Sequence, residues 1–347
     1  MIDRRTLIGG LVGAAVTVAV TGPEAQAQVF GTFDVPDQLL PLYLSNQSWV
    51  GLPISDVMAV TGGLKQRFTS ADLYHSSSVG ASIVTGKIKS AYDGAGGPGS
   101  LGLPIGTEVV SGTYSCRTQG FVSGRIWYSS THGSRVAPSS KTVRLSGAPN
   151  FRDVAGEGSG ISVSGGRMRR GMVYRSSRLG SINSRDKFIL QTLGVGTTVA
   201  LSSSTPPTIP GITKVRYSIY NPSSSTLAQK QAMYRQYVTS SSNRSSVGKV
   251  LKLIASNNKP VVFQCLRGWD RTGWVAAVIQ GLLGASSSTI MNEFLKSNSY
   301  NGPGVKSAYL DAAVSTMKSR YGSYHGYVSA CGVSDSAVST LRDKLIH

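Results

Sequence analysis

A cysteine and an arginine separated by five residues, between an apolar run and a helical pattern, restrict the fold more than any other feature. Residues 265–273 read Cys-Leu-Arg-Gly-Trp-Asp-Arg-Thr-Gly. The apolar run at 259–264 predicts a buried strand, and the apolar side chains of residues 272–283 predict a mostly buried helix. The sequence therefore predicts a strand, a tight loop and a helix in immediate succession.

This segment contains the three groups that attack on a phosphate monoester requires. Cys265 supplies a thiolate nucleophile, and the loop after it can curl so that its backbone N–H groups converge on the phosphoryl oxygens. Arg271 supplies a planar, bidentate cation for the charge of the transition state, and Gly268 permits the tight turn. A helix that begins near Arg271 directs its positive end at the thiolate and the anion. We therefore predict a cysteine-dependent phosphatase, in which Thr272 hydrogen-bonds the sulfur.

The loop and its flanking segments resemble the bacterial protein tyrosine phosphatase-like enzymes. This family includes the secreted mycobacterial type that acts on phosphotyrosine and phosphoinositides, and its loop reads His-Cys-x-x-Gly-Lys-Asp-Arg-Thr-Gly. Residues 150–156 (Asn-Phe-Arg-Asp-Val-Ala-Gly), 171–176 (Gly-Met-Val-Tyr-Arg-Ser) and 321–324 (Tyr-Gly-Ser-Tyr) are similar to further family motifs. The resemblance covers residues 141–347.

The resemblance implies roles for individual residues. Cys265 would be the nucleophile, Arg271 would bind phosphate, and Asp270 is the first candidate for the general acid. Asp153 is the second candidate; for either carboxylate, orienting Arg271 or capping a turn is an equally good interpretation. The residues predicted to bind phosphate or substrate are Leu266, Arg267, Gly268, Trp269, Thr272, Asp153 and Arg152.

Three positions depart from the family pattern. Gln264 stands where the family has histidine, which removes a group that orients the cysteine. Trp269 stands where the family has lysine. This removes a positive charge that would suit multiply phosphorylated substrates and adds an aromatic face that could stack on a ring. Residues 200–202 read Ala-Leu-Ser where the family has Asp-Leu-Arg. Two alternatives to a tyrosine phosphatase therefore stay open: a phosphatase for lipid or sugar phosphates, and a weakened domain that only binds anions.

The region before the phosphatase-like part contains an internal repeat with a period of a little over fifty residues. Gly-Leu-Pro at 51–53 recurs at 102–104, and Gln66 corresponds to Gln119. The pattern resembles the LGFP repeat of actinobacterial envelope proteins, which implies contact with a cell-wall glycan. The repeated aromatic residues suit either sugar stacking or a small core; they are Phe68, Tyr74, Phe121 and Tyr128.

The N-terminus is typical of a targeting segment. Arg4 and Arg5 precede a Gly/Ala/Val-rich apolar stretch and Ala-Gln-Ala at 25–27, which predicts a twin-arginine signal peptide over 1–27. An uncleaved signal anchor is the alternative. The LGFP-like repeats then occupy 28–137, a linker 138–140, and the catalytic domain 141–347. We predict no transmembrane span in the mature chain, and a protein that is secreted or attached to the cell envelope.

Charge and composition agree with an anionic substrate. The chain carries a formal net charge of +19, and residues 141–347 contain 26 Lys and Arg against 8 Asp and Glu. The densest basic cluster, which could edge the substrate cleft, is Arg167, Arg169, Arg170, Arg175 and Arg178. No nucleic-acid-binding motif is present. Three cysteines and four dispersed histidines indicate neither a disulfide framework nor a metal site, and the chemistry requires no cofactor.

Strands alternate with helices in the second part of the chain. We predict a strand at 197–201 and helices at 226–254 (broken near 240–246), 292–296, 306–321 and 336–346. This alternation predicts an α/β phosphatase-like domain with a central, mostly parallel sheet flanked by helices, preceded by a small Gly-rich repeat domain. Ligands bind such sheets at the carboxyl ends of the strands, where Cys265 falls.

Overall fold

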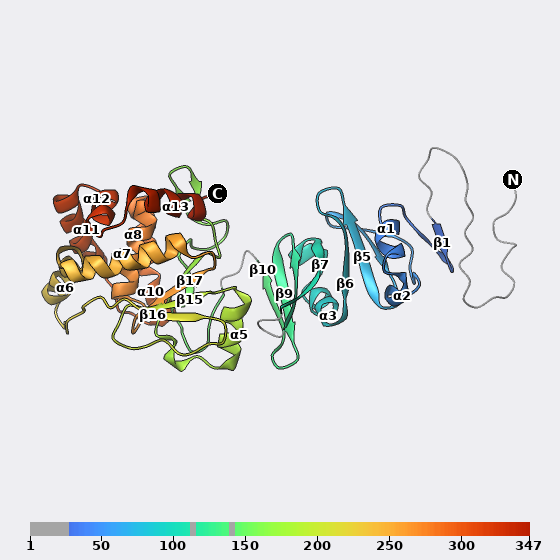
Figure 1. Ribbon diagram of the computed structural model, residues 1–347, viewed down its shortest axis with the longest axis horizontal. Coiled ribbons are helices and arrows are strands. Elements are labelled where there is room, and N and C mark those ends of the chain that lie inside the picture. Colours follow the sequence, from blue (N-terminus) through green and yellow to red (C-terminus); the bar gives the residue numbers. More distant parts are fainter. Residues whose placement is uncertain (1–27, 112–115, 139–142) are drawn as a thin grey trace, which may run out of the picture. The chain divides into compact units, whose positions relative to one another are not determined.

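The computed structural model describes residues 28–111, 116–138 and 143–347, and the chain divides into two compact units, Met1–Ser139 and Ser140–His347 (Figure 1). The expected signal peptide at 1–27 lies outside the described residues, as do residues 139 and 140 of the expected linker.

The first unit consists of antiparallel strands with short helices. A hairpin, β1–β2, precedes two four-stranded sheets in the orders β3-β4-β5-β6 and β7-β8-β9-β10. The strands are β1 (Gln28–Phe30), β2 (Phe33–Val35), β3 (Met58–Val60), β4 (Gly63–Arg67), β5 (Ala71–Ser76), β6 (Gly80–Thr85), β7 (Pro104–Ser111), β8 (Cys116–Phe121), β9 (Gly124–Ser129) and β10 (Gly133–Pro138). The helices are α1 (Leu40–Leu44), α2 (Gln47–Val50), α3 (Gly86–Gly94) and α4 (Pro98–Leu101).

The sequence repeat is also a structural repeat. Gln66 is fully buried, and its side-chain amide donates to the carbonyl of Ser55 at 3.0 Å. Gln119 is equally buried and donates to the carbonyl of Gly106 at 2.9 Å. Both acceptors lie two residues after a Gly-Leu-Pro motif, so each glutamine ties its strand to the segment that follows this motif, and leaving its amide unpaired would be costly.

The repeated aromatic residues belong mainly to the cores of this unit. Phe68 packs against Tyr43 at a centroid distance of 4.9 Å, and Phe121 stacks on Tyr92 at 4.4 Å. Phe68, Phe121 and Tyr74 are buried, whereas Tyr128 is half-buried. The three buried rings therefore do not present faces for stacking on sugars, and the core interpretation holds for them.

The second unit is built around one five-stranded sheet in the order β11-β14-β17-β15-β16. Four strands are parallel, and the edge strand β11 is antiparallel to β14. These strands are β11 (Arg152–Asp153), β14 (Val173–Ser176), β15 (Thr197–Ala200), β16 (Thr213–Arg216) and β17 (Val261–Gln264); β12 (Ser162–Val163) and β13 (Gly166–Arg167) form a separate hairpin. The predicted mostly parallel α/β sheet is confirmed.

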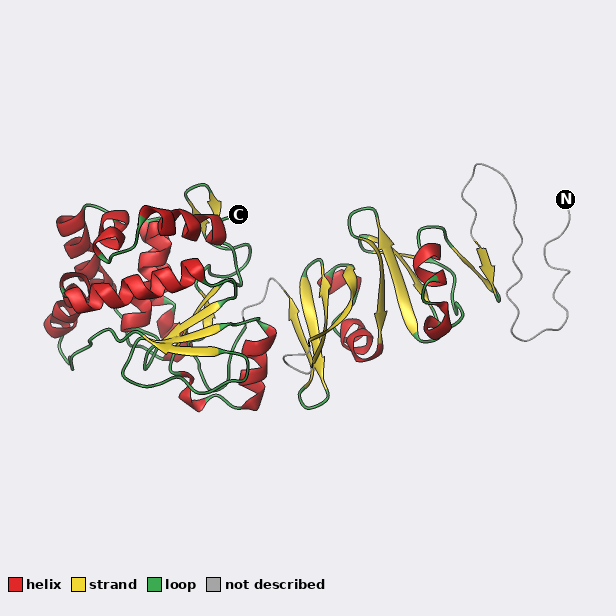
Figure 2. Ribbon diagram, in the orientation of Figure 1, coloured by secondary structure: helices red, strands yellow, loops and turns green. Residues whose placement is uncertain are grey.

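Helices cover this sheet unequally. The helices are α5 (Ser184–Thr192), α6 (Leu227–Thr239), α7 (Ser241–Ser256), α8 (Asp270–Leu282), α9 (Ser287–Leu295), α10 (Ser297–Asn301), α11 (Ser307–Tyr321), α12 (Tyr324–Ala330) and α13 (Asp335–Leu345), with a 3₁₀ turn at Leu179–Ser181. Along β17, Val261 and Phe263 enter the large core formed with α6, α7, α8 and α11, whereas Val262 enters a smaller core with Leu190 of α5. Figure 2 shows most of the helices on one side of the sheet and α5 on the other. Both faces of the central strand are therefore buried, as its continuous apolar sequence indicates.

Most predicted elements of this unit are confirmed, with some differences in extent. The strand before the loop, the strand at 197–201 and the helices at 306–321 and 336–346 fall within two residues of their predicted bounds. The predicted break at 240–246 is only Ser240, which ends α6 and caps α7 by accepting from Asn243. The helix predicted at 292–296 begins earlier, at Ser287.

Candidate active site

The Cys265 loop lies at the carboxyl end of the central strand. Cys265 follows β17 directly and is 3 % exposed, and α8 begins five residues later at Asp270. The predicted sequence of strand, loop and helix is therefore present, with the first turn of α8 next to the cysteine. The positive end of the helix dipole favours an anion at this position.

Gly268 gives the loop its sharp turn. Its φ of +69° lies in the left-handed region, which a residue with a side chain rarely adopts. A Cβ at this position would lie 2.7 Å from the carbonyl oxygen of Ser176 and 2.8 Å from Nδ2 of Asn150. Both the backbone conformation and the close approach of β14 therefore require glycine here.

The loop is held from outside by its carbonyl groups. The amide of Asn150 donates to the carbonyls of Arg267 at 3.1 Å and Gly268 at 3.0 Å, and the backbone N–H of Arg178 donates to Leu266 at 3.2 Å. Among the described residues, none accepts a hydrogen bond from the N–H groups of residues 266–271. The loop after Cys265 therefore leaves its backbone N–H groups available, as the binding of a phosphoryl group requires.

Two buried arginines support the loop from behind. Arg175 is 2 % exposed and donates to the carbonyl of Gly268 at 2.9 Å; burial lowers its pKa, and the neighbouring Arg152 adds to that. Arg152 is 3 % exposed and hydrogen-bonds the side chain of Asn150, and both arginines donate to the hydroxyl of Ser297. Burial lowers the pKa of Arg152 to about 10.

These contacts place Arg152 behind the loop. Its predicted substrate contact is not supported, because its guanidinium is used to hold Asn150. Arg175 belongs to the basic cluster that was expected to edge the substrate cleft. In the structure it supports the loop instead. The signal for this role lay in the Asn-Phe-Arg-Asp and Tyr-Arg-Ser segments, which resemble family motifs, but only the sheet register shows that they meet.

Arg271 and Thr272 have polar groups without hydrogen-bond partners in the described part of the chain. Nε of Arg271 is buried without a hydrogen bond, and Arg271 forms no ion pair with the described residues. Thr272 is fully buried and its hydroxyl also has no hydrogen bond to a described residue, so the bond expected to the sulfur of Cys265 is not formed. A planar cation and unpaired donors beside a thiol match what a bound phosphoryl group would satisfy.

Asp270 connects the start of α8 to α6. One carboxylate oxygen accepts from the hydroxyl of Tyr234 at 3.0 Å, and the other lies 3.4 Å from Nζ of Lys230. Tyr234 and Tyr237 are fully buried, so they belong to the helix core. Burial raises the pKa of Tyr234, and the nearby Asp270 carboxylate raises it further.

Asp153 lies away from the loop. Its carboxylate accepts from the N–H groups of Ala155 at 2.9 Å and Gly171 at 2.6 Å, so it caps a turn. In the sheet register Asp153 pairs with Tyr174 of β14, and Tyr174 pairs with Val262 of β17. Asp153 is therefore two strands away from β17, level with a residue that precedes Cys265 by three positions. At about 3.3 Å per residue this is ~10 Å along the sheet, out of reach of a leaving group. The predicted substrate contact and acid role of Asp153 are therefore not supported; burial raises its pKa to about 6.

The Trp269 ring packs against the protein. The guanidinium of Arg267 lies 5.0 Å from the ring centroid, and a Cβ on Gly304 would lie 2.1 Å from the ring. The ring is half-buried, and these contacts occupy surface that stacking on a substrate ring would need. The predicted aromatic platform is not supported by this arrangement.

The departures from the family pattern lie beside the loop. The side-chain carbonyl of Gln264 accepts from the N–H of Leu179 at 2.6 Å, so this residue anchors the segment after β14. Ala200, which pairs with Gln264 at the end of β15, is fully buried and contributes no acid. Neither position therefore adds a charged group to the carboxyl edge of the sheet.

The basic cluster is divided between the two ends of the sheet. Residues before β14 lie at its amino edge and residues after it at its carboxyl edge, because β14 runs parallel to β17. Arg167, Arg169 and Arg170 precede β14, and Arg169 contacts the C-terminal backbone at Ile346. Of the five arginines, only Arg178 is exposed at the edge that carries Cys265. The expectation that the whole cluster edges the cleft is wrong.

The remaining titratable residues form no second centre. Among the described residues, no three His, Cys, Asp or Glu side chains gather closely enough to hold a metal ion. Cys331 is a free, buried thiol, and burial raises its pKa to about 12. No helix within the described ranges has the length and apolar character needed to span a membrane.

The fold and this site together are those of a cysteine-dependent phosphatase. The model of the tyrosine phosphatase family matches residues 143–347, more than half of the chain, and the LGFP repeat model matches residues 50–100. The chain belongs to the tyrosine phosphatase family, and it is a phosphoric monoester hydrolase preceded by LGFP repeats.

Three individual proteins are similar to this chain at low sequence identity. Triple specificity protein phosphatase PtpB of Mycobacterium tuberculosis is 24 % identical over 278 residues, covering 58 % of this chain and 98 % of that protein. Among solved structures, the core catalytic domain of the PP-IP phosphatase SIW14 from S. cerevisiae, in complex with citrate, has 16 % identity and a TM-score of 0.31, covering 52 % of this chain and 95 % of that one. A structure of the Siw14 catalytic core has 15 % identity and a TM-score of 0.32, covering 59 % and 94 %.

Proposed function

We propose that this protein is an exported phosphatase that removes phosphate from phosphotyrosine in proteins through a thiophosphate intermediate. The observation that carries the proposal is the set of unpaired donors, the N–H groups of 266–271 and Nε of Arg271, gathered beside a thiol. Donors fixed in place before the substrate arrives stabilise the charge of the transition state without reorganising.

The reaction has two steps. The sulfur of Cys265 attacks phosphorus, so an S–P bond forms while the bond from phosphorus to the tyrosine oxygen breaks, and Arg271 with the loop N–H groups binds the three equatorial oxygens. Asp270 donates a proton to the leaving phenolate. In the second step Asp270 takes a proton from water, the water oxygen bonds to phosphorus, and the thiolate leaves as phosphate is released.

Asp270 is the preferred acid because it is the acidic residue of the loop, at the first position of α8. Its contacts with Tyr234 and Lys230 equally suit the alternative, in which it only orients the loop. The two roles differ in their dependence on the leaving group. An acid matters most when the leaving oxygen is basic, whereas an orienting group matters for every substrate.

We expect Asp270→Asn to lower kcat/KM for a phosphotyrosine peptide by roughly 10²-fold, within the range for general acids, and to change that for para-nitrophenyl phosphate far less. Para-nitrophenolate leaves without protonation, whereas the tyrosine phenol has a pKa of about 10. The measurement is steady-state kinetics on both substrates, extended to phosphoserine peptides, phosphoinositides and sugar phosphates. An equal loss on both substrates would assign Asp270 to orientation, and a wild-type preference for lipid or sugar phosphates would contradict the phosphotyrosine assignment.

A second candidate is a phosphate-binding module with weakened catalysis. It is favoured by Gln264, which hydrogen-bonds Leu179 rather than orienting the cysteine, and by the absence of an acid at Ala200. The same kinetic panel separates the two: vanadate or phosphate binding without turnover of any substrate would make this module the leading function.

We also propose that residues 1–27 are a twin-arginine signal peptide, that residues 141–347 are the catalytic domain, and that the repeats in 28–137 attach the enzyme to a cell-wall glycan. The LGFP match at 50–100 and the Arg4-Arg5 pair support this organisation. Deletion of residues 30–136 should release the enzyme from cell-wall pellets into the soluble fraction, with para-nitrophenyl phosphate turnover retained. Unchanged pelleting of the deletion variant would rule out attachment through the repeats.

A further inference from the structure

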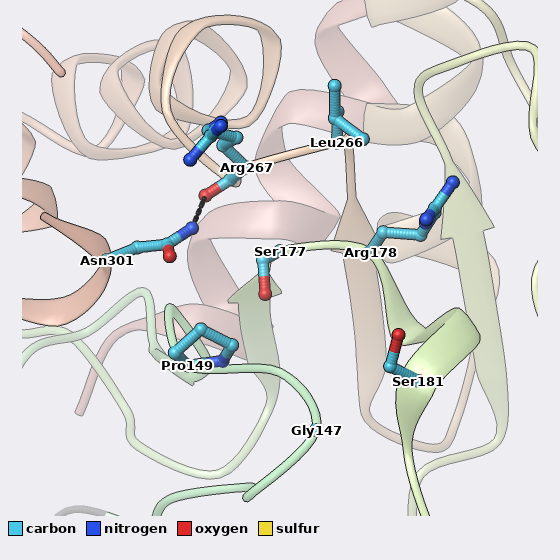
Figure 3. Close-up of a pocket in the computed structure, with 8 residues that line it drawn as sticks. All are labelled: Gly147, Pro149, Ser177, Arg178, Ser181, Leu266, Arg267 and Asn301. Atoms are coloured by element: carbon cyan, nitrogen blue, oxygen red, sulfur yellow. Dashed lines mark hydrogen bonds between the residues drawn. The ribbon is translucent and has the colours of Figure 1, made fainter.

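A cavity lies beside the phosphate-binding loop, and two loop residues, Leu266 and Arg267, contribute to its lining. Its volume is about 260 Å³, and Cys265 does not line it. The lining residues come from the segment before β11, the segment after β14, the loop and α10; they are Gly147, Pro149, Ser177, Arg178, Ser181, Leu266, Arg267 and Asn301 (Figure 3). The strand directions place the first three of these segments at the carboxyl edge of the sheet, the edge that carries the cysteine.

Ser177 gives this cavity an unsatisfied polar group. The residue is 4 % exposed, and its hydroxyl forms no hydrogen bond with any described residue. Figure 3 shows the side chain directed toward the space between Pro149 and Ser181. An unpaired buried hydroxyl loses its hydration without compensation, and a ligand that accepts its hydrogen bond would remove this cost.

Two arginines are also among the lining residues of the cavity. Arg178 and Arg267 are exposed and lie on either side of Leu266 at its rim, and none of its lining residues is acidic (Figure 3). Arg267 is fixed there by Asn301, which donates to its backbone carbonyl at 3.0 Å, and by the Trp269 ring. Arg178 is tied to the loop through its backbone, so its exposed side chain can turn across the opening. A guanidinium and a hydroxyl donor together match a tetrahedral oxyanion.

We propose that this cavity is a second oxyanion site, which binds a phosphate or sulfate group next to the catalytic loop, with Ser177 and Arg178 as its main donors. The oxyanion is either a second charged group of the substrate or a free anion that acts through the loop. Binding of an oxyanion at this second site does not depend on the proposed function. A role of the site during turnover, however, rests on the proposed phosphatase activity.

The binding test uses inorganic phosphate and the full chain. Phosphate is titrated into ¹⁵N-labelled protein, and the Nε–H resonance of Arg178, assigned by Arg178→Gln, is followed. We expect this resonance to shift and saturate in the wild type and in Arg271→Ala, and Ser177→Ala to weaken this binding roughly 10-fold through loss of a hydrogen bond to a charged group. Arg235→Gln, which removes an exposed charge from α6, is the matched control and should bind as the wild type does.

The proposal is overturned if the Arg178 resonance does not respond in Arg271→Ala, because the phosphate would then bind only at the catalytic loop. It is also overturned if Ser177→Ala binds phosphate with unchanged affinity. Ser177→Ala removes a hydroxyl that has no partner among the described residues, so the melting temperature without phosphate should not fall, and this result would confirm that the variant folds.

Kinetics identify the source of the oxyanion. If the substrate supplies it, Arg178→Gln raises KM about 10-fold for a peptide with phosphates on neighbouring side chains and leaves para-nitrophenyl phosphate unaffected. If a free anion supplies it, added sulfate changes kcat/KM for para-nitrophenyl phosphate in the wild type but not in Arg178→Gln. If the enzyme is active but shows neither the KM effect nor the sulfate effect, the site has no role in turnover. If the wild type turns over no substrate, the proposed function is refuted, and the phosphate titration still tests whether the second site binds an oxyanion.

Discussion

Cys265→Ser should abolish hydrolysis of para-nitrophenyl phosphate, with a loss of roughly 10⁴-fold or more in kcat, the scale found when a catalytic nucleophile is removed. A serine hydroxyl has nearly the same size but does not ionise under these conditions, so no covalent intermediate forms. The residue is 3 % exposed and the loop is held by its carbonyls, so the phosphate site itself should persist. Initial rates from about pH 5 to 8, without added metal, measure the loss.

Cys331→Ser is the matched control for this experiment. Cys331 is also a free, buried thiol, at 6 % exposure, but it lies at the end of α12 rather than at the loop. We expect it to retain activity within a factor of about two. Retention of more than about 1 % of the activity in Cys265→Ser, or an equal loss in both variants, would contradict a thiolate mechanism.

Arg271→Lys should lower kcat/KM by roughly 10³-fold, comparable to the loss of a principal transition-state donor. The substitution keeps the positive charge but removes the planar fork that bridges two phosphoryl oxygens. The guanidinium has no ion pair among the described residues, and its Nε is buried without a hydrogen bond, so its loss affects ligand binding rather than a protein contact. The affinity of Arg271→Lys for phosphate, measured as inhibition by phosphate, should also fall.

The corresponding change at an exposed position, Arg235→Lys on α6, controls for charge and handling. It should leave both kcat/KM and phosphate inhibition unchanged. If Arg271→Lys stayed within about fivefold of the wild type, Arg271 would act only as a point charge, and the bidentate geometry inferred from the spacing would be wrong.

The sequence was a reliable guide where the determinants are local. The apolar run before Cys265 was predicted as a buried strand, and the structure confirms it, with both faces buried. The helix predicted to begin near Arg271 begins at Asp270. The break at Ser240 was predicted too wide, because serines scattered after a cap residue remain compatible with a helix that packs on its apolar face. The short helix α10 was missed because five residues carry too little periodicity to detect.

Residue roles that depend on distant contacts were predicted less well. Asp153 and Arg152 are adjacent in sequence, yet the former caps a turn away from the loop and the latter holds Asn150 behind it. Trp269 lies in the loop, but its ring packs on Arg267 and against Gly304. A carboxylate, a guanidinium or an indole can take several roles in a protein. Contacts with residues from distant segments of the sequence decide which role each of them has.

The sequence alone determined the chemistry of this protein: a cysteine, a glycine at the turn and an arginine at fixed spacing, between a strand and a helix whose apolar patterns are encoded locally. The tertiary structure decided which side chains support that loop. Asn150 and Arg175 reach Gly268 across 118 and 93 residues, and Ser177 borders a cavity with Asn301. Such contacts depend on the order and register of five strands. A local sequence pattern cannot predict them, because they form only when the sheet is assembled.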